Sequence, residues 1–199
     1  MRAVDGMAAV AVCPACGREH PFVRRPLFVL TGASGVGKTA VSHHLTRQTS
    51  QAVVLDGDIL WLEAFHAPEK WPDFFNLWLR LAKNIGQAGK PVLLAGAGFG
   101  VPDNLESCEE RRYFGDIYYL ALVCDDDELA RRLHARPAWR ESGGEAFVAS
   151  QLAFNQWFKA TATPTMKLLD TTRATVAETA VSVHHWFLGC LAQSDKIRE

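Results

Sequence analysis

The stretch Gly32-Ala33-Ser34-Gly35-Val36-Gly37-Lys38-Thr39 decides the fold of this chain. It reads G-x-x-x-x-G-K-T and follows an apolar run at 27–31, which indicates a phosphate-binding loop between a strand and a helix. In such a loop, backbone N–H groups and the start of the helix hold phosphate oxygens, and the glycines leave room for them. We therefore expect residues 32–39 to bind ATP, with Lys38 on the β- and γ-phosphates and Thr39 on Mg²⁺.

Four more apolar runs follow this loop, at 52–58, 91–96, 117–124 and 166–169, and each is short enough for a buried strand. Helices are expected at 37–48, 73–87, between 125 and 137, at 145–159, and after a capping box formed by Thr175 and Glu178. Strands that alternate with helices in this way predict an α/β protein of the P-loop NTPase class. Its five-stranded parallel sheet would have helices on both faces.

The composition fits one globular domain at 26–199 that is preceded by a small appendage at 1–25. The chain has 199 residues, 48% of them hydrophobic, and a formal net charge of −1. This charge provides no general basic field for nucleic acid or for an anionic membrane. No apolar run approaches the roughly 18 residues of a membrane span, and the start of the chain lacks the layout of a signal peptide. Five cysteines, an odd number, do not indicate a disulfide framework, so we expect the reducing cytoplasm.

The appendage carries Cys13-Pro14-Ala15-Cys16-Gly17, a C-x-x-C-G turn. Two cysteines at this spacing supply half of a tetrahedral Zn²⁺ site, which His20 or a second subunit would have to complete. A redox pair usually follows a strand at the start of a helix, and this turn lacks that position. The sequence leaves open whether Cys13 and Cys16 bind zinc or form a turn without function. It also leaves open whether the protein forms a homodimer.

Charged and glycine-rich segments follow the predicted strands at the edge where parallel sheets bind ligands. Besides the P-loop, this edge carries Asp56 and Asp58, the loop 96–100, and Asp170-Thr171-Thr172. We expect Asp58 to orient or deprotonate an acceptor hydroxyl, because it would face the phosphate that the P-loop holds. Asp56 is a candidate for the same substrate side or for a water on Mg²⁺. Either acid could instead cap the helix that follows.

The P-loop, which reads G-x-S-G-x-G-K-T, and the segment Leu55-Asp56-Gly57-Asp58 resemble small-molecule kinases of the nucleoside-monophosphate-kinase-like group. The motifs are most similar to the adenylylsulfate kinase, gluconate kinase and chloramphenicol phosphotransferase types. One departure is Ile59-Leu60-Trp61, which stands where adenylylsulfate kinases have an arginine-containing segment. The resemblance implies ATP-dependent phosphoryl transfer to a hydroxyl group of a metabolite, nucleoside or antibiotic.

The resemblance also implies a small lid at about 132–145, whose arginines would close over the transferred phosphoryl group. Arg132 and Arg136 are the expected catalytic arginines, and Arg140 is expected on the substrate side. A local alternative for Arg132 is an ion pair with Glu128 on the helix surface. Asp170-Thr171-Thr172 would border the adenine ring.

The acceptor is expected between Asp58 and the loop 96–100, with Gly98 at the edge of its pocket. Trp61 and Phe65 lie in the intervening segment and could stack on a planar or sugar-like acceptor, although such rings are often core residues. Two other functions stay open. One is a nucleotide-binding regulatory ATPase or switch that holds a partner through its cysteine segment, and the less favoured one is a polynucleotide-end kinase.

Overall fold

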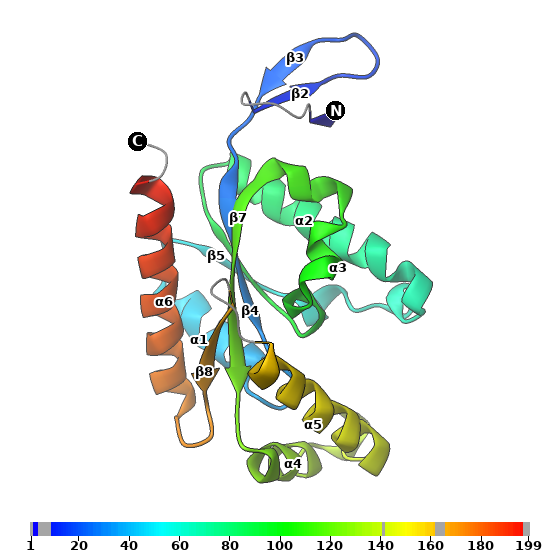
Figure 1. Cartoon of the computed structure of the whole chain (residues 1–199), viewed down its shortest axis with the longest axis vertical. Coiled ribbons are helices and arrows are strands. Elements are labelled where there is room, and N and C mark those ends of the chain that lie inside the picture. The colour runs from blue at the N-terminus through cyan, green and yellow to red at the C-terminus, as the bar shows by residue number, and fades with distance from the viewer. Residues whose placement is uncertain (1, 4–8, 141, 162–165, 197–199) are drawn as a thin grey trace.

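The structure is a computed structural model that describes residues 2–3, 9–140, 142–161 and 166–196. Its main body is a five-stranded sheet in the order β5-β6-β4-β7-β8, in which every neighbouring pair is parallel (Figure 1). The predicted five-stranded parallel sheet is therefore confirmed. The strands are β4 (Arg25–Thr31), β5 (Val53–Asp56), β6 (Val92–Ala95), β7 (Phe114–Val123) and β8 (Met166–Asp170).

Helices cover both faces of this sheet. Helices α1 and α6 pack on one face, and α2 and α3 pack on the other (Figure 1). Helices α4 and α5 lie together beyond the carboxyl end of β7. None of the helices in the described ranges is long and apolar enough to cross a membrane. Their bounds are α1 (Lys38–Gln48), α2 (Trp71–Gln87), α3 (Pro102–Glu106), α4 (Asp126–His134), α5 (Glu145–Ala160) and α6 (Val176–Lys196).

The side chains of β4 show why the sheet needs helices on both sides. Leu27 and Val29 join the core beneath α2, whereas Phe28 and Leu30 join the core beneath α1 and α6. All four side chains are fully buried. Successive side chains of a strand point to opposite faces, so a strand that is covered on both faces has a continuous apolar run. This run places the P-loop directly after the central strand.

The predicted start of β7 differs from the structure. Strand β7 begins at Phe114, three residues before the predicted start at 117, because Phe114 still pairs with Arg25 in the ladder. Gly115 and Asp116 interrupt the apolar pattern and conceal this extension.

The predicted capping box is confirmed: Thr175 Oγ1 accepts a bond from the Glu178 N–H at 3.2 Å, and Glu178 Oε2 accepts one from the Thr175 N–H at 2.8 Å.

A separate three-stranded antiparallel sheet precedes the main body and projects from the start of β4 (Figure 1). Its anchors are the Phe22 and Tyr113 rings, 5.0 Å apart, and Gln87, which bonds both backbone groups of Val23 at 3.0 and 2.7 Å. Part of the predicted appendage, residues 1 and 4–8, lies outside the described residues. The strands are β1 (Arg2–Ala3), β2 (Val10–Val12) and β3 (Glu19–Pro21).

Candidate active site

The loop between β4 and α1 has the backbone of a phosphate cradle. Gly32 and Gly37 have φ angles of 131° and 104°, which side-chain-bearing residues rarely adopt. A Cβ atom on Gly32 would also lie 2.2 Å from the Leu122 carbonyl oxygen on β7. The backbone conformation and this close approach together explain the glycines, and they leave the loop free of side chains where phosphate would enter.

Helix α1 begins at the end of this loop without a side-chain cap. Its N-cap residue is Gly37, which offers no acceptor, and its first turn contains no acidic residue. The first N–H groups of a helix have no partner within it, and its dipole gives this end a partial positive charge. The start of α1 is therefore suited to a bound anion.

Lys38 is held in the fold of the loop. Its Nζ donates hydrogen bonds of 2.8 Å to the carbonyl oxygens of Gly32 and Ala33. Burial, with a smaller contribution from the charge of Arg136, lowers the pKa of the Lys38 ammonium to about 8, while Asp58 and Asp56 oppose the shift. A phosphate group bound beside Lys38 would stabilise its buried positive charge, because the negative charge of the phosphate offsets the cost of burial.

A cavity of about 330 Å³ opens over the loop and the start of α1. Its lining brings Lys38, Arg136 and Arg140 together with Asp58. Burial and the neighbouring Arg140 lower the pKa of Arg136, whereas Asp58 raises it. Clustered cations with lowered pKa values indicate an anion site. The other lining residues are Ser34, Gly35, Gly37, Thr39 and Ala40.

The two acids after β5 have different positions. The buried Asp56 accepts a 3.0 Å hydrogen bond through Oδ1 from the Asp58 N–H and so caps the 3₁₀ turn at Gly57–Leu60. The capping alternative is thus the geometry observed for Asp56. Asp58 is exposed and lines the cavity. Asp56 therefore fixes the backbone from which the Asp58 carboxylate reaches the phosphate site.

The lining of the cavity could hold the phosphates of a nucleotide together with Mg²⁺. The uncapped helix start, Lys38 and the two arginines would hold phosphate oxygens, and the Thr39 hydroxyl stands where it could ligate the metal. Strand β6 ends at Ala95 and supplies no acid at this edge. Asp58 is the carboxylate of the lining, so it is the acid available to a metal-bound water.

Arg132 differs from the expectation of a catalytic lid arginine. Its guanidinium contacts Glu128 Oε1 at 2.7 Å and donates bonds to the carbonyl oxygens of Thr171 and Thr172 at 2.7 and 3.4 Å. It does not line the cavity, which Arg136 and Arg140 reach instead. The local ion-pair alternative therefore describes Arg132. The partners of Arg132 explain why it does not reach the cavity, because their hydrogen bonds hold the planar guanidinium group elsewhere.

The segment Asp170-Thr171-Thr172 connects the end of β8 to its neighbours. Asp170 Oδ1 accepts bonds from the Thr172 N–H and hydroxyl at 2.7 and 2.6 Å, which lower the pKa of that carboxyl group. The buried Thr171 hydroxyl lies 3.1 Å from the Val123 carbonyl oxygen and 3.3 Å from that of Val36 in the P-loop. This segment thus supports the P-loop from behind, and a role beside adenine stays a prediction.

On the acceptor side, the Phe99 ring acts as a wedge between two loops. A Cβ atom on Gly57 would lie 2.4 Å from this ring, and one on Gly96 would lie 2.5 Å from it. Gly98 is packed against Phe75 and hydrogen-bonded through its carbonyl to Asn104, so it lies away from the cavity lining where a pocket edge was expected. The wedge sets the distance between the loop that carries Asp58 and the loop after β6.

The two aromatic candidates have different environments. Phe65 is partly buried and packs against the core, with its ring 5.4 Å from that of Phe74. Trp61 is 43% exposed, stands edge-on to Phe74 at 5.1 Å and stacks on His66 at 5.3 Å. Of the two, only Trp61 offers an open ring face to a ligand.

The zinc prediction is not supported. Cys13 and Cys16 lie in the turn between β2 and β3, where hydrogen bonds from the Ala15 and Cys16 backbone lower the pKa of the Cys13 thiol. However, the described residues contain no group of three His, Cys, Asp or Glu side chains that could hold a metal ion. His20 lies within β3, paired with Ala11. Within the described part of this chain, the two thiols therefore have no further ligands to complete a tetrahedral site.

One contact at the cavity was missed by the sequence analysis. Gln151 on α5 accepts a hydrogen bond through Oε1 from the Ser34 N–H in the P-loop at 2.8 Å. Its neighbour on the same helix, Asn155, is fully buried and bonds both backbone groups of Cys124 at 3.4 and 2.8 Å. Polar residues on an apolar helix face are the signal that could have revealed them, because buried amides need partners.

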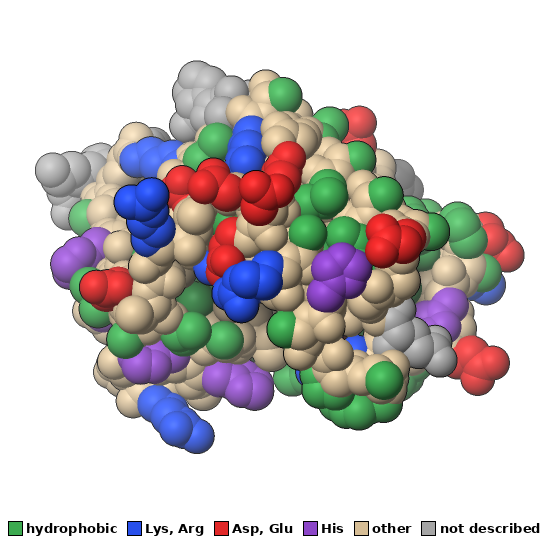
Figure 2. Space-filling view, turned by 90° about the horizontal axis from the view of Figure 1, so that it is seen from below, with side chains coloured by type: hydrophobic (Ala, Val, Ile, Leu, Met, Phe, Trp, Pro, Cys, Tyr) green, Lys and Arg blue, Asp and Glu red, His purple; other side chains and the backbone are tan. Residues whose placement is uncertain are grey.

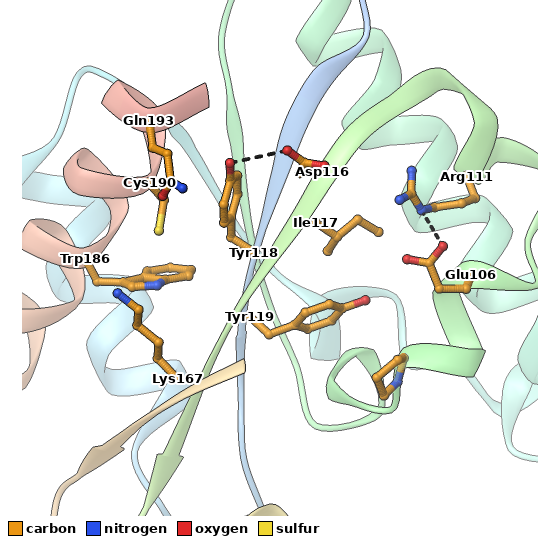
Figure 3. Close-up of a pocket in the computed structure, with 11 residues that line it drawn as sticks. Glu106, Arg111, Asp116, Ile117, Tyr118, Tyr119, Lys167, Trp186, Cys190 and Gln193 are labelled. Carbon is orange, nitrogen blue, oxygen red and sulfur yellow. Dashed lines mark hydrogen bonds and ion pairs between the residues drawn. The ribbon is translucent and has the colours of Figure 1, made fainter. Parts of the chain in front are cut away.

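A larger cavity, of about 430 Å³, lies toward the amino end of β7 and away from the P-loop. Figure 3 shows Arg111 paired with Glu106 on one side of the strand, and Trp186 and Lys167 on the other. Ligands of parallel sheets bind at the carboxyl ends of the strands. We therefore assign the candidate active site to the smaller cavity.

No model of a known protein family matches the chain, and no curated protein matches it. Solved structures do match. A gluconokinase from Sinorhizobium meliloti 1021 has 18% sequence identity and a TM-score of 0.55, over 86% of this chain and 99% of its own. The Mycobacterium tuberculosis APS kinase has 14% identity and a TM-score of 0.56, over 82% and 98%. A Bacillus halodurans tRNA isopentenylpyrophosphate transferase has 12% identity and a TM-score of 0.62, over 88% and 99%.

These likenesses, together with the P-loop, define the class of fold: the chain has the architecture of the P-loop small-molecule kinases. At such low identities a likeness shows the fold alone. Two of the three structures are kinases of the types that the motifs resemble, and the third is named as a transferase. The reaction of this chain must therefore be argued from its own site.

Proposed function

We propose that the protein transfers the γ-phosphoryl group of ATP to a hydroxyl group of a small molecule. The observation that carries the proposal is the presence of Asp58 in the same cavity as Lys38, Thr39 and Arg136. A phosphate cradle alone would suit any nucleotide-binding protein. A carboxylate opposite the phosphate site adds a group that can take the proton of an acceptor hydroxyl.

Each of these residues has a role in the proposed transfer. The P-loop N–H groups and Lys38 hold the β- and γ-phosphates, and Arg136 and Arg140 neutralise charge on the transferred group. Asp58 orients the acceptor hydroxyl and takes its proton while the acceptor oxygen bonds to the γ-phosphorus and the bond to ADP breaks. Mg²⁺ bound through Thr39 would supply further neutralisation of the phosphate charge.

Two further proposals accompany this function. We place the protein in the cytoplasm because its cysteines are free thiols, which suits a reducing compartment. We also favour a small molecule over nucleic acid as the acceptor. In support, acidic and basic side chains are interspersed on the face where α4 and α5 lie, instead of forming one basic stripe (Figure 2).

The test is ATP consumption with Mg²⁺, measured alone and with a panel of hydroxyl compounds, followed by mass spectrometry of the products. The proposal expects at least one acceptor that accelerates turnover and gains a phosphoryl group. Asp58→Asn should lower this transfer by about 10²–10⁴-fold. It should leave ATP affinity equal or tighter, since it removes a negative charge from beside the phosphates.

Asp56→Asn is the matched control, because asparagine keeps an oxygen that can accept the Asp58 N–H bond. It should retain most of the transfer. Full transfer by Asp58→Asn would exclude the assigned role. ATP binding without turnover for any acceptor would favour a nucleotide-dependent switch instead.

A further inference from the structure

Two residues that line the active-site cavity, Asp58 and Arg140, have exposed apolar side chains close to them in the chain. Asp58 is followed by Ile59, Trp61 and Leu62, which are 69, 43 and 55% exposed. Arg140 follows Trp139, which is 75% exposed, and the Arg140 guanidinium lies 5.0 Å from the centre of the Trp139 ring. Each of these two lining residues therefore has an exposed tryptophan within three positions of it.

Exposed apolar side chains are most frequent in the two segments next to Asp58 and Arg140. In the described residues, five of the ten exposed large apolar side chains lie between 59 and 71 or at 139. They include Trp61, Trp71 and Trp139, the three tryptophans of that set. Tryptophan is seldom left open to water, so aromatic rings gathered beside a reaction site indicate a binding surface.

Trp61 is also held in place before any ligand arrives. Its ring stands at 86° to the buried Phe74 ring, 5.1 Å away, and the His66 ring stacks on it at 5.3 Å. Edge-to-face and stacked contacts of this kind fix an aromatic ring. A flat apolar ligand group could therefore bind Trp61 at a low cost in side-chain entropy.

The charges beside this surface are unfavourable to an anion. The segment 57–73 holds four carboxylates and one lysine, and Lys70 already lies 3.9 Å from Asp73. The cations of the cavity, Lys38, Arg136 and Arg140, are those assigned above to the phosphates. Arg111, which follows the next loop, is engaged by Glu106 at 2.8 Å and lines the other cavity. An acceptor with a carboxylate or phosphate would find repulsion on the acceptor side.

We propose that the acceptor is a hydroxyl compound without negative charge that carries an aromatic or alkyl group, bound against Trp61 and Trp139. This inference rests on the proposed function, since it names the acceptor class of that transfer. Its apolar group covers the exposed rings, while its hydroxyl reaches Asp58. The chemistry is that of phosphoryl transfer to oxygen, with the proton passing to Asp58.

The experiment compares two acceptor pools in the ATP-consumption assay. The first contains uncharged amphipathic hydroxyl compounds: phenicol antibiotics, alkyl and aryl glucosides, and aromatic diols. The second contains anionic ones: gluconate, glucuronate, shikimate and sugar monophosphates. We expect phosphorylated products from the first pool. Trp61→Ala should then lower kcat/KM for the best acceptor about tenfold, mainly through the acceptor KM, with the ATP KM unchanged.

A second variant reverses the expected preference. Ile59→Arg places a cation on an exposed position beside Asp58 and should raise turnover of the anionic pool about tenfold. Val181→Ala and Val181→Arg, at an exposed apolar position on α6, are the matched controls and should change neither pool. Together, these variants separate a local effect at the cavity from a general effect of surface change.

The outcomes distinguish this inference from the proposed function. Turnover of the anionic pool by the unmodified protein, unaffected by Trp61→Ala, would overturn the inference and leave the kinase function standing. Turnover of the first pool that Trp61→Ala and Trp139→Ala leave unchanged would also overturn it, and would assign these rings to another partner. ATP binding without turnover of either pool would overturn the inference, whereas the proposed function would fall only if no acceptor of the broad panel accelerated turnover.

Discussion

The Gln151 side chain accepts a hydrogen bond from the Ser34 backbone N–H at 2.8 Å, and this bond joins helix α5 to the phosphate loop across 117 positions of the chain. Ser34 lines the active-site cavity. An N–H group has one hydrogen, so Gln151 and a phosphate oxygen would compete for it. The contact therefore couples helix α5 to the occupancy of the phosphate site.

Gln151→Ala should strengthen ATP binding and lower the thermal stability of the protein without nucleotide. The substitution frees the Ser34 N–H for phosphate, which would tighten ATP binding about 2–10-fold if one neutral hydrogen bond is gained. The melting temperature without nucleotide should fall, because α5 loses a tether. Calorimetric titration with ATP and thermal unfolding measure the two effects.

Gln156→Ala is the control for this prediction. Gln156 is an exposed amide on the same helix, and it bonds to Asp126 at 2.5 Å instead of the P-loop. It should leave ATP affinity unchanged. Weaker ATP binding by Gln151→Ala would show that Gln151 assists the phosphate site and does not compete with it.

Gly57→Ala should disturb the loop that carries Asp58. The added Cβ would lie 2.4 Å from the Phe99 ring and 3.0 Å from the Ala95 carbonyl oxygen. Overpacking of this kind typically costs about 1–3 kcal/mol of the free energy of unfolding. Chemical denaturation measures this loss. Phe99→Leu should relieve part of it, so the double variant should be less destabilised than the sum of the single variants. Strict additivity would argue against the wedge.

Arg136→Ala and Arg132→Ala should affect different properties. Arg136 lines the cavity, so its loss should reduce transfer by about 10²-fold or more. Arg132 bonds Glu128 and the Thr171 and Thr172 carbonyl oxygens, so its loss should mainly lower the melting temperature. Turnover at saturating substrates and thermal unfolding of both variants provide the comparison. Equal loss of turnover in both would return Arg132 to the catalytic lid.

ATP affinity should fall as the pH rises through about 8. Burial lowers the pKa of Lys38 to about 8 in the free protein, and bound triphosphate raises it by supplying negative charge. The complex therefore holds more protons than the free protein above this pH, and binding takes up protons there. Titration of ATP in EDTA, in two buffers of different ionisation enthalpy, measures this uptake. Lys38→Arg keeps its charge and should abolish the pH dependence in this range. A flat profile in the unmodified protein would contradict the assigned shift.

The sequence was sufficient for the fold because its signals are local. The apolar runs and the capping box of Thr175 and Glu178 specify strands and helices within a few residues, and both agree with the structure. The P-loop is similar, since its glycines and Lys38 stand in one continuous stretch. Such features can be predicted because their partners are close in the chain.

The sequence is less informative where a role depends on distant partners. Arg132 and Arg136 are four positions apart and look equally suited to a lid in the sequence, yet Arg132 is engaged by Thr171 and Thr172, about forty positions away. Gln151 is the converse case, a polar helix residue whose contact with the P-loop no local pattern indicates. Contacts between segments that are far apart in the chain determine the roles of Arg132 and Gln151, and a single sequence does not specify such contacts.

The wedge formed by Phe99 also has a consequence for the history of this sequence. While a phenylalanine occupies position 99, Gly57 and Gly96 can accept no larger residue without a clash. A smaller residue at 99 would remove the ring contact at both positions, although the Ala95 carbonyl oxygen would still lie 3.0 Å from a Cβ atom at 57. In related chains a larger residue at 57 or 96 should therefore occur together with a smaller one at 99, and this covariation would record a contact between two loops nearly forty residues apart.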